Sequence, residues 1–190
     1  MKLLEDRIVK DGIVLPGDVL KIDSFLNHQV DVKLMDEIGK EFHELFIDTN
    51  PDKILTIESS GIAIASAASR YFGFVPVVYA KKVAASNMSK NTYACKERSY
   101  TRNIDYLVQV SKEFLHEGER VLILDDFLAN GEAMNAMIDI CNQAGVTIVG
   151  CGSVVCKTYQ PGEKRIKDMG YHVEVLARVK SMENNTIEFE

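Results

Sequence analysis

The chain has 190 residues, of which 46% are hydrophobic and 26% charged, and its formal net charge is -6. This length and composition predict one soluble globular domain with a sizeable core, and no apolar run approaches the roughly 20 residues that span a bilayer. The acidic balance argues against nucleic acid or a membrane surface as a partner, because such binders present a basic face to phosphates, but it does not exclude small anionic ligands.

Residues 1–29 do not fit the core pattern, and because acidic side chains come before any apolar region, no secretory signal is expected there. The next segment, Asp31–Phe46, has apolar residues at helical spacing, which is typical of a helix that packs one face on a sheet.

Five apolar segments rich in branched residues are predicted to be buried strands. They are Lys53–Ile57, Val75–Ala80, Asp105–Val110, Val121–Leu124 and Val146–Val155. Helical stretches over Ile62–Tyr71 and Gly131–Ala144 alternate with them, and Gly145 is expected to end the second helix. This order predicts βαβ units, and hence an α/β fold with a mostly parallel central sheet flanked by helices. One or two short peripheral strands are expected in Tyr171–Glu190.

A polar insertion of residues 81–103 interrupts the apolar pattern. It holds six basic residues: Lys81, Lys82, Lys90, Lys96, Arg98 and Arg102. A polar insertion of this length is typical of a functional lid or of a surface hairpin, and the pattern leaves both interpretations open.

The most informative segment is Val121–Ala133, where an apolar strand runs into Asp125 and Asp126. In open α/β sheets, ligands bind at the carboxyl ends of strands. The helix that follows presents unpaired backbone N–H groups to a phosphate, and the small residues Ala129 and Gly131 allow a close approach. The two carboxylates can accept hydrogen bonds from the hydroxyls of a ribose. The alternative is a solvated acidic pair that caps the helix.

This run of apolar residues, two acids and a small-residue loop resembles the phosphoribosyl pyrophosphate (PRPP) signature of type I phosphoribosyltransferases. Many members carry a Thr-Gly-Gly-Thr-like loop, whereas this one reads Ala129, Asn130, Gly131, Glu132 and Ala133. The hydroxyls are missing, so the resemblance implies that backbone amides and Asn130 bind the 5′-phosphate. The variant is similar to the branch that holds bacterial xanthine phosphoribosyltransferases and purine-operon repressors.

The resemblance also implies the organisation of the chain. A single domain over residues 1–190 would have the type I phosphoribosyltransferase fold, with a core of about 31–156. A small hood would form from about 1–30 and 157–190, and a flexible lid loop from about 81–103. The resemblance also implies that the protein is a homodimer, that it is located in the cytoplasm, and that it binds Mg²⁺ through PRPP. The four cysteines (Cys95, Cys141, Cys151 and Cys156) would be free thiols.

Further site residues follow from the resemblance. Ser60 and Gly61 lie in a turn that, in the family, cradles pyrophosphate through backbone N–H groups, often with an unusual peptide geometry. Lys81 would be a cation against pyrophosphate, and Ser99-Tyr100 matches the Ser-Tyr element of the lid.

The base site is implied by three residues. Leu20 and Asn27 match the purine-covering hood, and Lys157 follows the last long strand. A lysine only donates hydrogen bonds, so it would favour the C2 carbonyl of xanthine over the amino group of guanine. Each residue also has a structural alternative. Leu20 could simply pack in the core, Asn27 could form a turn, and Lys157 could be an ordinary surface lysine.

The implied activity is transfer of a phosphoribosyl group from PRPP to xanthine, with Asp125 and Asp126 as the catalytic pair. A guanine- or hypoxanthine-type enzyme is one alternative, although Ala129 stands where such relatives carry an aspartate. A second is a PRPP-sensing transcriptional regulator, but residues 1–52 are short for an added DNA-binding domain. An RNA-binding attenuator would need a basic face. A Rossmann enzyme is disfavoured, because no G-x-G-x-x-G opens a helix.

Overall fold

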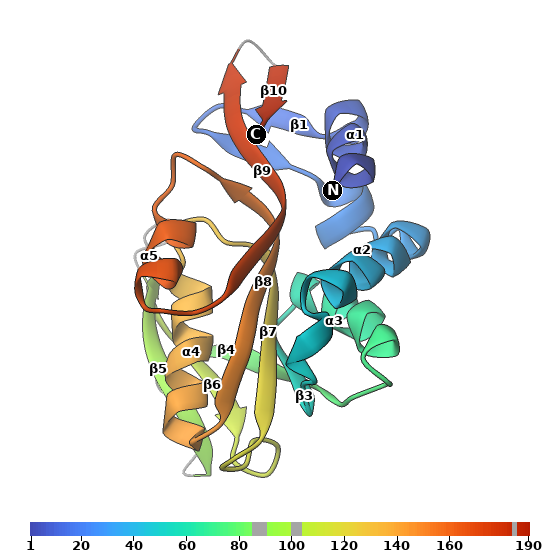
Figure 1. Ribbon diagram of the computed structural model, residues 1–190. Coiled ribbons are helices and arrows are strands. Elements are labelled where there is room, and N and C mark those ends of the chain that lie inside the picture. Colours follow the sequence, from blue (N-terminus) through green and yellow to red (C-terminus); the bar gives the residue numbers. More distant parts are fainter. Residues whose placement is uncertain (85–90, 100–103, 184–185) are drawn as a thin grey trace.

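The computed structural model describes residues 1–84, 91–99, 104–183 and 186–190. In this part of the chain a large sheet has the strand order β10-β9-β8-β7-β3-β4-β6-β5, and β1 and β2 form a separate hairpin (Figure 1). The strands of the large sheet are β3 (Lys53–Ile57), β4 (Val77–Ala84), β5 (Thr92–Ser99), β6 (Ile104–Ser111), β7 (Arg120–Phe127), β8 (Thr147–Lys157), β9 (Val173–Glu183) and β10 (Thr186–Phe189). The hairpin is β1 (Ile13–Leu15) and β2 (Val19–Lys21).

The helices are α1 (Lys2–Asp11), α2 (Val32–Leu45), α3 (Ser60–Tyr71), α4 (Glu132–Ala144) and α5 (Gly162–Asp168), with a π-helical turn η1 (Asp23–Asn27) and a 3-10 turn η2 (Ile47–Thr49). Gly145 ends α4 with a positive φ of 68°, as predicted. Asp31 caps α2 by accepting a hydrogen bond from the backbone N–H of Leu34 at 3.2 Å.

The centre of the sheet is parallel, which confirms the predicted fold class. β4, β3, β7, β8 and β9 pair in parallel, whereas β6, β5 and β10 add antiparallel strands at the two edges. The prediction of short peripheral strands near the C-terminus was wrong for β9, which has 11 residues and pairs with β8. Its buried run of Val175, Leu176 and Ala177 is typical of a parallel strand covered on both faces.

Helices cover both faces of the sheet (Figure 1). Alternate residues of β7 point to opposite faces: Val121 and Ile123 belong to the apolar cluster that includes α4, and Leu122 and Leu124 to the cluster that includes α2 and α3. The two clusters explain why β7 reads as a continuous apolar run before its two acids.

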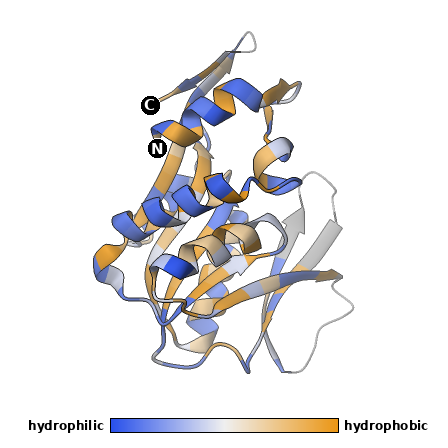
Figure 2. Cartoon of the chain, turned by 90° about the vertical axis from the view of Figure 1, so that its right-hand side faces the viewer, coloured by the Kyte–Doolittle hydropathy of each residue, from blue (hydrophilic) through white to orange (hydrophobic). Residues whose placement is uncertain are grey.

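α2 approaches α3 closely at Gly39. A Cβ atom at this position would lie 2.7 Å from the backbone carbon of Ala67. Figure 2 looks onto these two helices and shows hydrophilic and hydrophobic residues alternating along α2. Glycine at position 39 thus allows α2 to pack closely on α3.

The described part of the polar insertion is built of strands. Lys81–Ala84 continue β4, and β5 pairs antiparallel with β6 from Thr92↔Ser111 to Ser99↔Ile104. These residues follow the hairpin interpretation. Residues 85–90 and 100–103, and with them Tyr100 of the expected lid, lie outside the described residues, so the lid stays a prediction.

The N-terminal and C-terminal segments lie together at one end of the sheet (Figure 1). Leu4 and Ile8 of α1 are fully buried in the cluster that also holds Leu176 and Val179 of β9. This end is the one toward which β3, β7 and β8 run.

The four cysteines are free, as expected, and Cys141, Cys151 and Cys156 are buried. Burial raises the pKa of each of these three thiols to about 12. Among the described helices, none is long and apolar enough to cross a membrane.

The close approach of α2 to α3 at Gly39 should contribute to the stability of the fold. Gly39→Leu should lower the free energy of unfolding by about 2 kcal/mol, because a side chain overpacks the contact with Ala67. Lys40→Leu places the same residue on the exposed side of α2 and is the control. Urea denaturation of both variants measures the difference; equal stabilities would contradict the close packing.

Candidate active site

The acidic pair lies at the carboxyl end of β7, as predicted. Asp125 is 3% exposed and Asp126 is partly buried. Asp125 Oδ1 accepts a hydrogen bond from the backbone N–H of Asp126 at 2.9 Å. Burial, together with the nearby negative charge of Asp126, raises the pKa of Asp125 well above its usual range. The two acids are thus in different environments: one is enclosed and the other faces neighbouring segments.

Asp126 joins three segments that are far apart in sequence. Its Oδ2 accepts a hydrogen bond from Ser60 Oγ at 2.6 Å, and Asn27 Nδ2 lies 3.5 Å from the same oxygen. Ser60 begins α3 and Asn27 ends η1. The structure therefore brings together three of the residues that the sequence analysis assigned to separate parts of the site.

The loop after the acidic pair exposes backbone at the start of α4. Ala129 and Asn130 are exposed, and Ala129 and Gly131 have positive φ values of 41° and 88°. The N–H of Gly131 bonds to the carbonyl of Leu128 at 2.7 Å, which closes the turn. The first N–H groups of α4, from Glu132 and Ala133, follow directly and have no partner within the helix. This geometry suits an anion.

Gly162, at the start of α5, supports this loop and was missed by the sequence analysis. Its N–H bonds to the carbonyl of Ala129 at 3.1 Å. A Cβ atom at Gly162 would lie 2.3 Å from that carbonyl oxygen and 2.9 Å from the N of Gly131. The Pro161-Gly162 pair signals a turn in the sequence, but nothing local shows that it packs against the loop.

The turn between β3 and α3 contains a cis peptide bond between Glu58 and Ser59, an unusual peptide geometry of the kind that the family resemblance implies. The Glu58 carboxylate accepts a hydrogen bond from the backbone N–H of Lys82 at 2.6 Å. Gly61 has no room for a side chain, because a Cβ atom there would lie 2.0 Å from Thr56 Oγ1. Backbone at this turn is therefore close to both β4 and the acidic pair.

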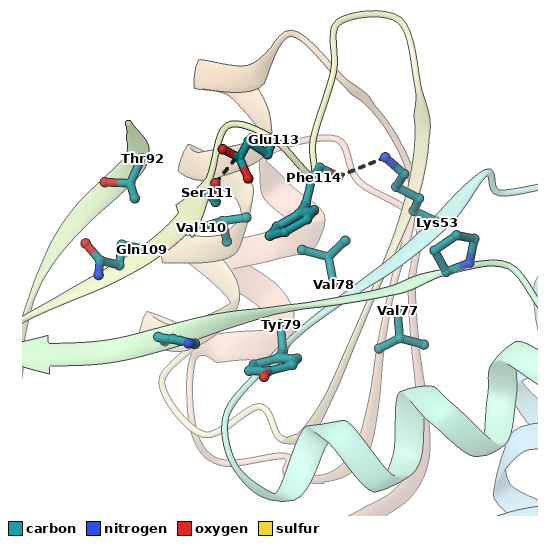
Figure 3. A pocket seen from close by; sticks show the side chains of 12 residues that line it. Lys53, Val77, Val78, Tyr79, Thr92, Gln109, Val110, Ser111, Glu113 and Phe114 are labelled. Carbon is teal, nitrogen blue, oxygen red and sulfur yellow. Dashed lines mark hydrogen bonds between the residues drawn. The ribbon is translucent and has the colours of Figure 1, made fainter. Parts of the chain in front are cut away.

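Of the two neighbouring lysines on β4, Lys81 lies away from the acidic pair. Its Nζ is 6.0 Å from the ring centroid of Tyr79, and its side chain lines a cavity of about 650 Å³ that opens elsewhere on the sheet, beside Gln109 and Phe114 (Figure 3). Lys82, by contrast, acts on Asp125: its positive charge lowers the pKa of that carboxyl, although burial and Asp126 outweigh it. Lys82 is thus a site cation that the sequence analysis did not single out.

Lys157 lies at the end of β8 and is 9% exposed. Its Nζ donates to the backbone carbonyl of Asp18 and lies 3.3 Å from Asp18 Oδ2. Leu20, 7% exposed, is two residues from Asp18 on the same hairpin. The structure thus places Lys157 against the segment that carries Leu20. Asp18 was not predicted, since Pro16-Gly17-Asp18 signals only a turn.

Within the described residues, no three His, Cys, Asp or Glu side chains gather closely enough to hold a metal ion. The oxygen ligands present are those of the acidic pair, and Asp126 already accepts hydrogen bonds. Carboxylate oxygens are the ligands that Mg²⁺ prefers in proteins, so the donor atoms of the acidic pair fit this ion.

Comparisons with known proteins agree with this geometry. Residues 21–190 match the model of the phosphoribosyl transferase domain family. Xanthine phosphoribosyltransferase 2 of Clostridium botulinum (strain Langeland / NCTC 10281 / Type F) is 52% identical to this chain over 190 residues. The alignment covers 100% of both chains. Xanthine phosphoribosyltransferase of Laribacter hongkongensis is 50% identical over 189 residues, again with full coverage of both.

Two solved structures show the same fold. The Giardia lamblia adenine phosphoribosyltransferase complexed with 9-deazaadenine has a TM-score of 0.76 at 20% identity, covering 94% of this chain and 98% of that one. The Rhodothermus marinus adenine phosphoribosyltransferase has a TM-score of 0.73 at 21% identity, covering 94% and 100%. With a family model that matches most of the chain and full-length relatives at about half identity, this chain belongs to the phosphoribosyltransferase family.

Proposed function

We propose that the chain is a xanthine phosphoribosyltransferase of purine salvage, a pentosyltransferase that converts xanthine and PRPP to XMP and pyrophosphate. One observation carries the proposal: an acidic pair, an open backbone loop and a nearly buried lysine all lie at the same end of a parallel sheet. The relatives named above as xanthine phosphoribosyltransferases support the choice of base.

PRPP would lie along the carboxyl ends of β7 and β3. The 5′-phosphate would bind the loop of Ala129, Asn130, Gly131, Glu132 and Ala133, where the first backbone N–H groups of α4 are available to an anion. The ribose hydroxyls would contact Asp125 and Asp126. Ser60 and Gly61 would hold the pyrophosphate, with Mg²⁺ arriving as part of the substrate. Lys81 keeps its proposed pyrophosphate role only if its side chain leaves the ring of Tyr79.

The reaction needs no protein nucleophile. A purine nitrogen attacks C1′ of the ribose, the bond from C1′ to pyrophosphate breaks, and pyrophosphate leaves with the bonding electron pair. The ring N–H proton of the purine is released to solvent. Positive charge develops on the ribose in the transition state, and the carboxylate of Asp126 stabilises it electrostatically. The remaining contribution comes from holding the two substrates in line and excluding water.

The purine would lie between η1 and the end of β8. Asn27 and Leu20 would cover it, and Lys157 would donate a hydrogen bond to the C2 carbonyl of xanthine. A guanine- or hypoxanthine-type enzyme is the second candidate, but a lysine ammonium cannot accept a hydrogen bond from the amino group of guanine. The homodimer and the cytoplasmic location implied by the resemblance belong to the same proposal.

The direct test is a pyrophosphate-release assay with PRPP, Mg²⁺ and a panel of bases. We expect kcat/KM for xanthine to exceed that for guanine by about tenfold or more, which corresponds to one charged hydrogen bond. Hypoxanthine, adenine and uracil complete the panel. Preferred turnover of guanine or hypoxanthine would replace the proposal with the second candidate, and turnover of no base would favour a regulator.

The role of the acidic pair is tested by binding. The double variant Asp125→Asn/Asp126→Asn should weaken binding of Mg²⁺-PRPP at least tenfold, because the carboxyl acceptors for the ribose hydroxyls and the negative charge that attracts the substrate-bound cation are lost. Isothermal titration calorimetry measures the change, and Asp168→Asn, on the exposed end of α5, is the matched control. Unaltered affinity in the double variant would refute the ribose role.

The role of Lys157 is tested by separating the two substrates. Lys157→Ala should lower kcat/KM for xanthine about 10- to 100-fold, since a charged donor is removed, while the affinity for PRPP stays within twofold. Lys164→Ala, an exposed lysine of α5, is the control. An unchanged kcat/KM for xanthine in Lys157→Ala would remove this lysine from the base site.

A further inference from the structure

Asp18 makes an unusual set of contacts for an exposed turn residue. It lies between β1 and β2, where Gly17 and Asp18 have positive φ values of 83° and 62°. Its side chain is 45% exposed, yet both carboxylate oxygens are engaged: Oδ2 lies 3.3 Å from Lys157 Nζ, and Oδ1 accepts a hydrogen bond from Tyr159 Oη at 2.6 Å. Its backbone carbonyl also accepts from Lys157.

These contacts determine how Lys157 is presented. An ammonium has three N–H donors. The carbonyl and the carboxylate of Asp18 engage two of them, and in the described chain Nζ makes no hydrogen bond to another residue. One donor is left for a ligand. Because the lysine side chain is only 10% exposed, the adjacent carboxylate also offsets the cost of keeping the ammonium charged.

Tyr159 fixes the orientation of the Asp18 carboxylate. Since Tyr159 binds one oxygen of Asp18 and Lys157 the other, the plane of the carboxylate is fixed from two sides. Two hydrogen bonds also hold the backbone that follows β8. The N–H of Thr158 donates to the carbonyl of Val179 at 2.9 Å, and the N–H of Gln160 donates to the carbonyl of Lys157 at 2.9 Å. The remaining donor of Lys157 therefore has a defined direction.

We propose that Asp18 is a positioning residue for base selectivity: it holds the Lys157 ammonium so that its one remaining N–H meets a purine carbonyl oxygen. Tyr159 supports Asp18 in this role. A charged, donor-only group at this point selects oxidised purines, which carry a carbonyl at C2, and rejects purines with an amino group there. The inference rests on the proposed function, because it assigns the carbonyl to xanthine.

A purely structural role for Asp18 makes different predictions. Asp18 could serve only to form the turn, since a positive φ favours Gly, Asn and Asp. Asn and Gly both tolerate this backbone conformation. Asp18→Asn and Asp18→Gly therefore preserve the turn, while the first removes the charge and the second removes the side chain.

The experiment measures kcat/KM for xanthine and for guanine, KM for PRPP and the thermal midpoint in Asp18→Asn, Asp18→Gly and Tyr159→Phe. Asp6→Asn is the matched control, because it breaks an exposed Lys–Asp pair of 2.6 Å in the same N-terminal part of the chain. We expect Asp18→Asn to lower kcat/KM for xanthine about tenfold and the xanthine-to-guanine ratio at least fivefold, as one charged contact is lost. Asp18→Gly should show a larger loss and Tyr159→Phe a smaller loss in the same direction. The KM for PRPP should stay within twofold.

An unchanged xanthine-to-guanine ratio in all three variants, with a wild-type enzyme that uses xanthine, would overturn the inference and leave the proposed function intact. A wild-type enzyme that does not use xanthine would overturn the proposed function, and the inference with it. Should both Asp18 variants lose their thermal transition, Tyr159→Phe decides alone, because it leaves the turn residues in place.

Discussion

Parallel pairing of β3, β7 and β8 is the constraint on which the rest of the site depends. Because the three strands run in the same direction, the turn after β3, the acids of β7 and the lysine of β8 end at one edge of the sheet. The hydrogen bond from Ser60 to Asp126 is a direct consequence, since it joins residues 66 positions apart. The chemistry of phosphoribosyl transfer then follows from groups that no single segment contains.

Burial gives the two acids different chemical properties. Asp125 is enclosed at the strand end, and its burial beside a second carboxylate disfavours the charged form. Asp126 instead faces Ser60 and Asn27, both donors, and its carboxylate accepts hydrogen bonds from segments distant in sequence. Two adjacent residues of one strand thus present different chemistry, because successive side chains of a strand point in opposite directions.

The N-terminal segment is attached to the site by polar contacts as well as by its core. Asn27 reaches Asp126, Asp18 reaches Lys157, and the N-terminal ammonium bonds to the carbonyl of Leu176. Polar contacts of this kind are directional, so they determine where the segment lies relative to β7 and β8. A base enclosed there would therefore be read by residues from both ends of the chain.

The sequence by itself determined the α/β class, the parallel centre, the end of α4 at Gly145 and the position of the acidic pair. These features follow from local rules: apolar runs form buried strands, and a glycine closes a helix with a positive φ. The length of β9 was missed, because its paired position against β8 becomes visible only when both strands are in place.

Only the tertiary structure decided which partners meet. Lys81 and Lys82 are neighbours in the sequence, but adjacent strand residues face opposite sides: the side chain of Lys81 lines the cavity beside Gln109, whereas the charge of Lys82 lowers the pKa of Asp125. Likewise, Gly162 beneath the Ala129 loop and Asp18 on Lys157 are contacts between distant segments. Residue patterns report local conformation, whereas such contacts depend on how strands and turns are placed in space.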